Sequence, residues 1–592
     1  MRSIFKGTQY MSTTNPGRPR IPRASAAALA SCLALVAGRA LADDAPMATA
    51  PDGSTAAPTQ PPSEIMAVNL IRLLVKQGVI TQAAADSIIQ QAQAETQQAQ
   101  LASARQGPPP PPPGVIRVPY VPEVVRNQIR DDLKKEVLAQ AQAEGWANPK
   151  VLPSWIDRVT WFGDFRFRDQ FDLYDKNNIE PFIDYATLNA NGPTDINFTT
   201  NPKGLPYLDT RNKRLDQLSL RARLGVNFDI IDGVALTVRL ASGSDNSPVS
   251  TTQALGGGLA KKDIWLDQAF VTLKPVDWAA LYLGRSPNEF MHTDILFDDN
   301  LNLDGVMATA EKGLFDPRLK LFGTAGAFPI GYVGANDPTN GQTKTPDSTK
   351  WLLAAQLGAK FQPDANSWFV RGAVAYYDFD NVAGKLSAPC DPTLVAQCST
   401  DDSRPAFMQK GNTLFLIRDL VSNAGALNFA EPQFVGLAYD YRLVDATAEL
   451  EAPLFDHVAG QIQADYVHNL AYDPGRFLAN PLTPPVTNFD NSYRSGPNAF
   501  MVKGTIGDLH PENRGDWLIS AGYKYIQPDA VLDAFNDHDF HLGGANAKGY
   551  ILSGSYYFAH NSWLNGRWLA AKEVYGPPLT IDVLQLELNT RF

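Results

Sequence analysis

Apolar and polar side chains alternate along much of the chain between residue 158 and the C-terminus. In the last such stretch, leucines at 584, 586 and 588 alternate with Gln585, Glu587 and Asn589. The same alternation occurs earlier, at 159–168, 218–229 and 234–240. Successive side chains of a β-strand point to opposite faces, so each stretch predicts a strand with one apolar and one polar face. A soluble β-sandwich also alternates in this way. The long strands and the aromatic-rich apolar faces favour a transmembrane barrel, with lipid outside and water inside.

The lengths of the connections between these stretches predict a topology. Links on one side are short, at 229–233, 274–277, 312–318, 363–366, 453–456, 510–515 and 560–566. Links on the other side are long apart from the last, at 171–213, 241–262, 286–304, 329–350, 380–433, 471–497, 528–547 and around 576–578. Outer-membrane barrels have short periplasmic turns and long external loops. We therefore predict an all-β fold, a transmembrane antiparallel β-barrel of about 16 strands over 158–592.

The first 42 residues predict a secretory signal peptide. A run of small and apolar residues at 24–38 follows three arginines, and Ala-Leu-Ala at 40–42 provides a cleavage site. The run is too short to cross a bilayer as a helix. Met11 is an alternative start. The sequence Leu-Ala-Ser-Cys at 29–32 also fits a lipoprotein signal, although cleavage there would divide the apolar run.

Four segments separate the signal peptide from the barrel. They are a disordered region at 43–62, a helical and weakly coiled-coil segment at 63–107, a Pro-rich linker at 108–122, and a periplasmic helix with its linker at 123–157. Heptad-like spacing of Ile88, Ala92, Glu95, Ala99 and Ala102 suggests self-association of the second segment. We expect these helices to lie in the periplasm.

Charge and cysteine content refine the picture. The signal peptide carries six basic residues and no acidic one, which leaves 45 basic and 62 acidic residues and a net charge of −17. That charge makes nucleic acid an unlikely partner for the protein. Beyond the signal peptide only Cys390 and Cys398 remain, and two cysteines close together in an exported protein predict a disulfide within the longest external loop.

Basic residues on the polar faces identify a candidate pore wall. The strand pattern points Arg166, Arg168, Arg221, Arg223 and Arg239 into the lumen on neighbouring strands. Fixed charge along a narrow pore sets ion selectivity. In the alternative interpretation, these arginines pair with Asp164, Asp229 and other lumen acids and brace the barrel. The two interpretations are compatible.

Acidic residues in the third external loop could face these arginines. Asp294, Asp298, Asp299 and Asp304 lie in that loop and at its end, and they would form an opposing acidic face if the loop folds inward. We treat them as a possible constriction loop.

Signals for an enzyme or a resident metal are poor. The seven histidines show neither catalytic-triad nor metal-binding spacing, so we predict no catalytic residues and no cofactor. Residues 300–311 match the ligand spacing of a calcium loop but lack flanking helices. The acidic and histidine-rich segment 537–541 could bind a metal, but a solvated loop is the simpler interpretation.

Four segments of the chain resemble a proteobacterial family described as "putative porin". They are VIRVPYVPE (115–123), GDFRFR (163–168), LDQAFV (266–271) and LFDDNLNLDG (296–305). The resemblance extends from about residue 64 to the end and implies an outer-membrane barrel. The terminal Phe592 also resembles the signal by which the barrel-assembly machinery receives such proteins.

Taken with the open lumen expected of sixteen strands, this resemblance predicts a porin, a passive channel for small hydrophilic solutes or ions. We expect it in the Gram-negative outer membrane, in contact with lipid and with a homotrimer as the candidate assembly. The alternative is a structural envelope protein, in which the N-terminal helices bind peptidoglycan or a partner.

Overall fold

The computed structural model describes residues 156–592 except 315, 334–347, 365–366, 394–396, 422–428, 479–484 and 487–493. The expected signal peptide, N-terminal helices and Pro-rich linker lie outside these residues. Among the described residues, no helix combines the length and the apolar character needed to cross a bilayer.

Sixteen antiparallel strands form the wall. In chain order they are β1 (Val159–Tyr174), β5 (Arg214–Ile231), β6 (Val234–Ser242), β8 (Ile264–Val276), β9 (Ala279–Pro287), β10 (Asn302–Leu314), β11 (Asp316–Gly331), β12 (Lys350–Phe361), β13 (Phe369–Asp380), β17 (Tyr441–Phe455), β18 (Val458–Asn469), β20 (Asn498–Gly507), β21 (Trp517–Ile526), β22 (Ala547–Ala559), β23 (Ser562–Glu573) and β24 (Thr580–Arg591). The shortest, β6 and β9, have nine residues each, which is enough to cross a membrane as a tilted strand.

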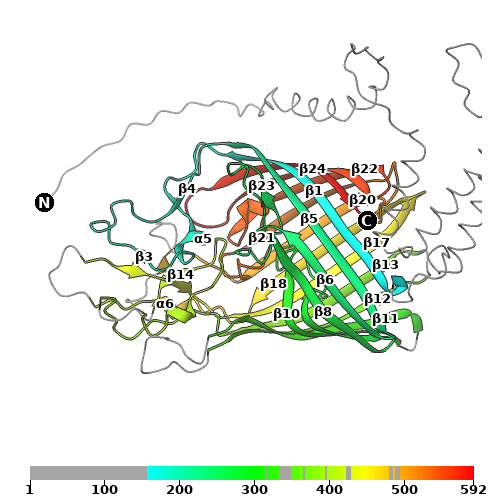
Figure 1. The fold of residues 1–592 in the computed structure, drawn as a ribbon, viewed down its shortest axis with the longest axis horizontal. Helices are drawn as coiled ribbons and strands as arrows, with labels where there is room; N and C mark the ends of the chain where they lie inside the picture. The colour runs from blue at the N-terminus through cyan, green and yellow to red at the C-terminus, as the bar shows by residue number, and fades with distance from the viewer. Residues whose placement is uncertain are drawn as a thin grey trace, which may run out of the picture. The chain divides into compact units, whose positions relative to one another are not determined.

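Pairing of the first and last strands closes the barrel. Each strand pairs with the next, and β24 pairs with β1 from Asp164↔Arg591 to Tyr174↔Ile581. The main chain of Phe592 extends this seam, because its N–H and C=O exchange hydrogen bonds of 3.1 Å with Gly163. The predicted sixteen-stranded antiparallel barrel is therefore confirmed, and Figure 1 shows long loops at one end and short turns at the other.

We number the long-loop connections L1 to L8. They are L1 (175–213), L2 (243–263), L3 (288–301), L4 (332–349), L5 (381–440), L6 (470–497), L7 (527–546) and L8 (574–579). The remaining short strands lie in these loops: β2 (Phe182–Ile183), β3 (Thr194–Asp195), β4 (Tyr207–Leu208), β7 (Gln253–Ala254), β14 (Leu414–Leu416), β15 (Pro432–Gln433), β16 (Val435–Leu437) and β19 (Pro485–Val486). So do α5 (Tyr185–Leu188), α6 (Gly475–Leu478), and the 3₁₀ turns η2 (Asp401–Ser403) and η3 (Phe540–Leu542); η1 (Ile156–Arg158) precedes β1.

The two faces of the wall have opposite chemistry. Large apolar side chains point outward and are exposed, including Trp161 at 61%, Leu357 at 77% and Tyr550 at 64%. Charged side chains point inward and are buried, such as Arg168 at 2% and Lys524 at 0%. A protein in water would expose far less contiguous apolar surface. This inverted arrangement is the one a lipid-embedded barrel requires.

Two of the loops fill part of the lumen. Phe290, Ile295 and Phe297 of L3 pack in one buried apolar cluster with Val531 and Phe540 of L7. Strands β12, β13 and β17 contribute Leu352, Tyr377 and Leu443 to the same cluster. Leu569 of β23 and Val583 of β24 belong to the same cluster, so the packed core formed with L3 and L7 also reaches the strands next to β1.

Candidate functional site

Six arginines from four strands line one side of the lumen. We call Arg166 and Arg168 (β1), Arg221 and Arg223 (β5), Arg239 (β6) and Arg567 (β23) the arginine wall. The cross-strand register brings them together, because Arg166 lies opposite Arg221 and Asp164 lies opposite Arg223. The first five are the arginines predicted from the sequence. Arg567 was missed, although Leu564, Gly566 and Trp568 alternate with Asn565 and Arg567 along β23.

Each arginine of the wall has a carboxylate partner. Asp164 accepts hydrogen bonds from Arg221 at 2.9 Å and from Arg223 at 2.6 Å. Arg239 donates to Asp267 at 2.6 Å. Since Asp229 lies exposed near the β5–β6 turn, the bracing partners are Asp164 and Asp267 and not Asp229.

The other three arginines share two carboxylates. Arg168 donates to Glu587 at 2.7 Å and to Asp539 at 2.8 Å, and Arg567 donates to Asp539 at 2.8 Å. Arg166 lies 3.6 Å from Glu587 and donates to Thr252 of L2 at 2.5 Å. Ion pairs of this kind lock the wall, as the bracing interpretation requires.

Pairing nevertheless leaves the wall positively charged. Two guanidinium groups face the single carboxylate of Asp164, and three face Glu587 and Asp539. Only Arg239 is matched one to one, by Asp267. The wall therefore carries two more positive than negative charges, so it both braces the barrel and produces a local field.

L3 folds inward and crosses to the far wall. The N–H of Met291 donates to Gln356 of β12 at 2.7 Å, and the hydroxyl of Thr293 donates to Asp465 of β18 at 2.6 Å. The Oδ1 atom of Asn300 lies 3.4 Å from both Arg221 and Arg223, so the same loop also contacts the arginine wall.

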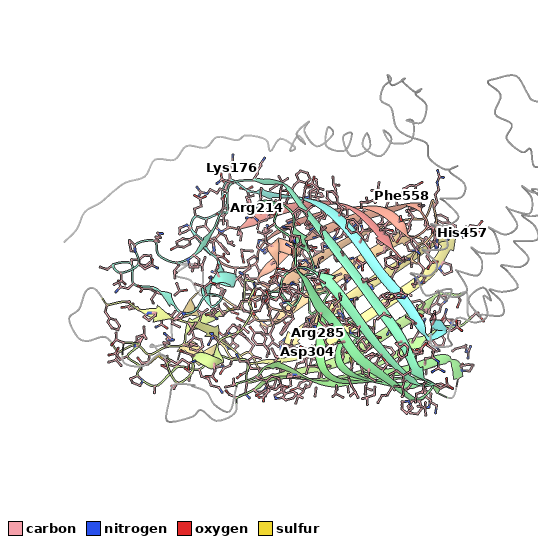
Figure 2. The ribbon with its side chains drawn as sticks, in the orientation of Figure 1. Lys176, Arg214, Arg285, Asp304, His457 and Phe558 are labelled. Atoms are coloured by element: carbon pink, nitrogen blue, oxygen red, sulfur yellow. A yellow bond between two sulfur atoms is a disulfide. The ribbon has the colours of Figure 1, made fainter. Side chains whose placement is uncertain are left out.

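Three of the four acids suggested for this loop belong to it. Asp294 and Asp298 make contacts inside the lumen, and Asp299 is exposed. The placement of Asp304 was wrong: it lies in β10, where it pairs with Arg285 of β9 at 3.0 Å. Figure 2 shows these two residues on adjacent strands. The strand begins two residues before Asp304, so this residue cannot move with the loop.

L7 is the main feature that the sequence interpretation missed. Residues 537–541 were expected in a solvated loop, but Asp537, Asp539 and His541 are all buried, at 6%, 8% and 0% exposure. Asp539 binds two arginines of the wall, and His541 receives a hydrogen bond from Lys410 of L5 at 2.6 Å. The apolar residues Val531 and Phe540 in the same loop were a signal of burial, since a solvated loop has no need of them.

L3 and L7 meet at a charged junction inside the barrel. The ammonium of Lys524 on β21 donates to Asp537 of L7 at 2.6 Å and lies 2.8 Å from Asp294 of L3. Two main-chain hydrogen bonds also join the loops, from Asp298 N–H to Phe535 O at 2.8 Å and from Asp537 N–H to Asp294 O at 3.1 Å.

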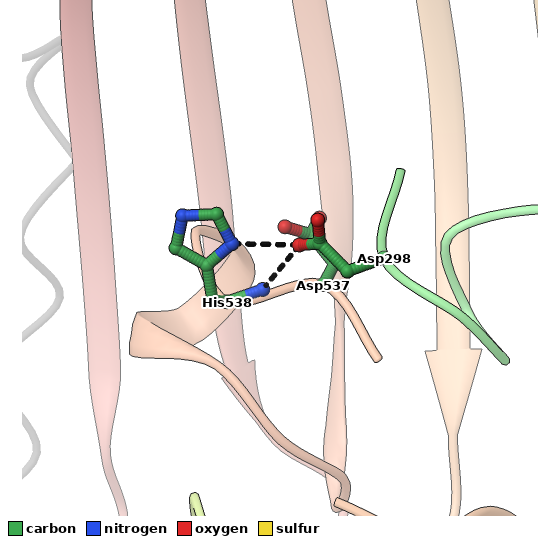
Figure 3. Close-up of side chains that lie close together, drawn as sticks. All are labelled: Asp298, Asp537 and His538. Atoms are coloured by element: carbon green, nitrogen blue, oxygen red, sulfur yellow. Dashed lines mark hydrogen bonds and ion pairs between the residues drawn. The ribbon is translucent and has the colours of Figure 1, made fainter. Parts of the chain in front are cut away.

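A histidine completes the junction. The Nδ1 atom of His538 lies 2.6 Å from Asp298, as Figure 3 shows. Burial lowers the pKa of His538, but the carboxylates of Asp539, Asp298 and Asp537 outweigh this effect and raise it. Burial also raises the pKa of Asp294, whereas Lys524 overcomes burial at Asp537 and lowers the pKa there.

Three groups of this junction are close enough to suggest a metal site. Ligand atoms of Asp298, Asp537 and His538 lie within 4.8 Å of one another. Lys524 already neutralises Asp537, and His538 in its charged form neutralises Asp298. A divalent cation would have to displace these positive groups, so the geometry favours an ion-paired junction.

Space for solutes lies at both ends of the lumen. A cavity of about 1170 Å³ opens among L2, L5 and L7. Its lining includes Asp267, which pairs with Arg239, and Thr251, the residue before the Arg166 partner Thr252. A second cavity of about 540 Å³ lies at the short-turn end, where inward-facing Asp229 and Thr272 line it. The arginine wall therefore lies between two water-accessible regions.

The long loops also form a cap. L5 and L6 share a sheet through β14, β16 and β19, and β15 of L5 pairs with β3 of L1. Cys390 and Cys398 form a disulfide in L5 with their Cα atoms 5.7 Å apart. Beside it, Arg418 makes two hydrogen bonds to Asp401, at 2.6 and 2.7 Å.

Comparison with solved structures returns outer-membrane proteins of low sequence identity. OprB of Pseudomonas putida, in its high-pH structure, is 12% identical and covers 74% of this chain and 95% of its own, with a TM-score of 0.38. The outer-membrane channel DcaP of Acinetobacter baumannii is 11% identical over 73% and 97%, with a TM-score of 0.34. The trimer form of OmpT from Vibrio cholerae is 11% identical over 73% and 99%, also with a TM-score of 0.34.

Comparison with sequences gives a more specific result. No curated protein matches the chain. A family model described as "Putative porin" matches residues 64–592, which include the whole barrel. The chain belongs to this putative porin family.

Proposed function

We propose that the protein is a passive channel of the Gram-negative outer membrane that favours small anions over cations. The observation that carries this proposal is the surplus of positive charge on the arginine wall, between the two lumen cavities. We orient the barrel with its long loops toward the outside of the cell and its short turns toward the periplasm, as in other outer-membrane barrels.

Local charge decides selectivity more strongly than total charge. Salt screens exposed loop acids within about 8–10 Å, whereas low-dielectric walls focus the field of charges inside a narrow passage. Side chains of Arg221, Arg223 and Arg239 are about 15% exposed, so they still face the passage despite their ion pairs. The protein is acidic overall, but a solute that passes the arginine wall meets a local field that attracts anions.

The pairing pattern permits a sharp test. Replacing Arg166 and Arg221 by Gln leaves one carboxylate for each remaining arginine, because Arg223 keeps Asp164 while Arg168 and Arg567 keep Glu587 and Asp539. This double variant should therefore remain folded and lose the surplus charge. The matched control is Arg318→Gln, an exposed arginine that pairs with Asp316 at a short turn.

Planar-bilayer recordings in a salt gradient supply the measurement. The reversal potentials of the parent and of Arg318→Gln should lie on the anion-selective side. That of the double Gln variant should lie near zero. A second double variant, Arg166→Glu with Arg221→Glu, should shift the reversal potential to the cation-selective side. No conductance from heat-modifiable, folded protein would disprove the channel. Equal reversal potentials in all four proteins would show instead that the wall only braces the barrel.

A further inference from the structure

The outer surface carries a pair of lysines that the channel does not use. We propose that Lys548 and Lys572, with Tyr525 and Tyr575, form a site for the phosphate of an anionic glycolipid in the outer leaflet; we call these four residues the rim patch. The proposal rests on the orientation given under the proposed function, which places the long-loop end at the outer leaflet.

Cross-strand register sets the rim patch in a single row. Phe500 of β20 lies opposite Tyr525 of β21, Tyr525 lies opposite Lys548 of β22, and Lys548 lies opposite Lys572 of β23. All of these positions belong to the outward face, because their neighbours Ile526, Ala547 and Ala571 are buried in the lumen. The row lies at the long-loop end, where β21 leads into L7 and β23 leads into L8.

The charges in this row are unbalanced. Like charges directly opposite each other destabilise a strand pair, and in the described part of the chain neither lysine forms an ion pair. Lys548 lies over the ring of Tyr525, 5.9 Å from its centroid. Asp582, the outward carboxylate on β24, lies one row deeper opposite Ala570, where it hydrogen-bonds with Trp568. A bound anion would balance both lysines.

Hydroxyl donors lie beside the lysines. Tyr525 and Tyr575 hydrogen-bond to each other, so one of their two hydroxyl hydrogens remains available to an acceptor. Gln527 donates to the Tyr575 hydroxyl at 3.0 Å and fixes its position. Two ammonium groups and a hydroxyl suit the several acceptor oxygens of a phosphate.

The surroundings indicate a lipid and not a free ion. The rings of Tyr523 and Tyr550 pack at a tilt with their centroids 5.1 Å apart, and those of Phe500 and Tyr525 stack with their centroids 5.4 Å apart. Such aromatic girdles mark the membrane interface. One and two rows deeper on β22, Tyr550 and Leu552 are exposed at 64% and 44%, so they can contact acyl chains. A phosphate held at the rim patch would thus continue into an apolar tail.

The test uses full-length mature protein in phosphatidylcholine nanodiscs. The probe is bisphosphorylated lipid A, compared with dephosphorylated lipid A and with inorganic phosphate as a competitor, and native mass spectrometry counts the bound molecules. The variant is Lys548→Gln with Lys572→Gln. The matched control is Lys312→Gln with Lys320→Gln, which removes two exposed lysines at the short-turn end.

The expected loss of affinity for lipid A is roughly fivefold per lysine, so about 25-fold in the rim variant. The control should bind as the parent does, and inorganic phosphate at the lipid concentration should displace nothing. Equal binding by the rim variant, equal binding of the dephosphorylated lipid, or displacement by inorganic phosphate would each overturn the proposal. Conductance of the rim variant should match the parent, so failure of the channel proposal and failure of this one are distinguishable.

Discussion

Replacement of Lys524 by Met should release L3 and L7 from each other while the barrel stays closed. Lys524 is fully buried on the wall, and its two carboxylate partners belong to the two loops. No main-chain hydrogen bond between strands depends on its side chain. The cost of the substitution therefore falls on the docking of the loops.

The size of the effect follows from burial. Removing one member of a buried ion pair costs about 3–5 kcal/mol, because the partner charge stays buried without compensation. Asp537 bears most of this cost, since its side chain is 8% exposed, whereas that of Asp294 is 27% exposed and keeps some contact with water. The undocked population of the loops should rise by roughly two to three and a half orders of magnitude.

Hydrogen exchange detects this change directly. The amides of Asp298 and Asp537 donate between the loops, so they exchange only when L3 and L7 separate. We expect their protection to fall by at least about a hundredfold in Lys524→Met, following the docking cost. Adding Asp537→Asn should recover part of the protection by removing the orphaned charge.

Lys503→Met provides the control, since Lys503 faces the lumen from the neighbouring strand β20 and forms no ion pair in the described part of the chain. It should leave both amides protected. If Lys524→Met also left them protected in folded protein, the apolar packing of Ile295, Phe297 and Phe540 would hold the loops together, and our account of the junction would be wrong.

Three further predictions concern the loops and the seam. The pKa of His538 is raised above 6.5, so its contribution to the docking of L3 and L7 is complete below that pH and is lost as pH rises through the raised value. The pKa of His541 is lowered by burial and by Lys410. Its contribution is therefore complete above pH 6.5 and is lost on acidification. Protection of the Asp298 and Asp537 amides against hydrogen exchange should therefore decline at both high and low pH. His538→Gln should reduce the decline at high pH, and His541→Asn should reduce the decline at low pH. At the seam, a Cβ on Gly163 would lie 2.5 Å from the carbonyl oxygen of Arg223 and 2.8 Å from the ring of Phe592. Gly163→Val should consequently reduce heat-modifiable protein in the outer membrane as much as deletion of Phe592 does, and normal amounts would contradict the role of this seam. Finally, Cys398→Ser should leave the barrel folded and should lower the stability of L5 by about 2–3 kcal/mol, because the disulfide no longer closes the loop. Free, alkylatable thiols in protein from the native envelope would refute the disulfide.

The barrel itself was predictable because its signals are local. A two-residue period and the alternation of short and long links can be read without knowing which strands are neighbours. The inward direction of Arg166 and Arg221 follows from the same period, and the register confirms that these two lie opposite each other. Strand pairing between consecutive segments then brings the predicted arginines together.

The path of L7 was not predictable in this way, because it depends on partners far away in the sequence. Asp539 needs Arg168, which lies 371 residues earlier, and His538 needs Asp298, which lies 240 residues earlier. A run of acids and histidines looks like a solvated loop until cations on the opposing wall are known. The same limit applies to Asp304, whose assignment to the loop depended on where β10 begins.

These distant contacts also set the charge of the arginine wall in an acidic protein. Asp539 contributes to the arginine wall from a loop, and without it Arg567 would lose its carboxylate partner while Arg168 and Arg166 would share Glu587. Docking of L7 thus sets the surplus charge at two, and undocking would raise it to three. Under the proposed channel function, loop position and ion selectivity are coupled through this one carboxylate. Substitutions that free L7 should then strengthen the preference for anions even though they touch no arginine.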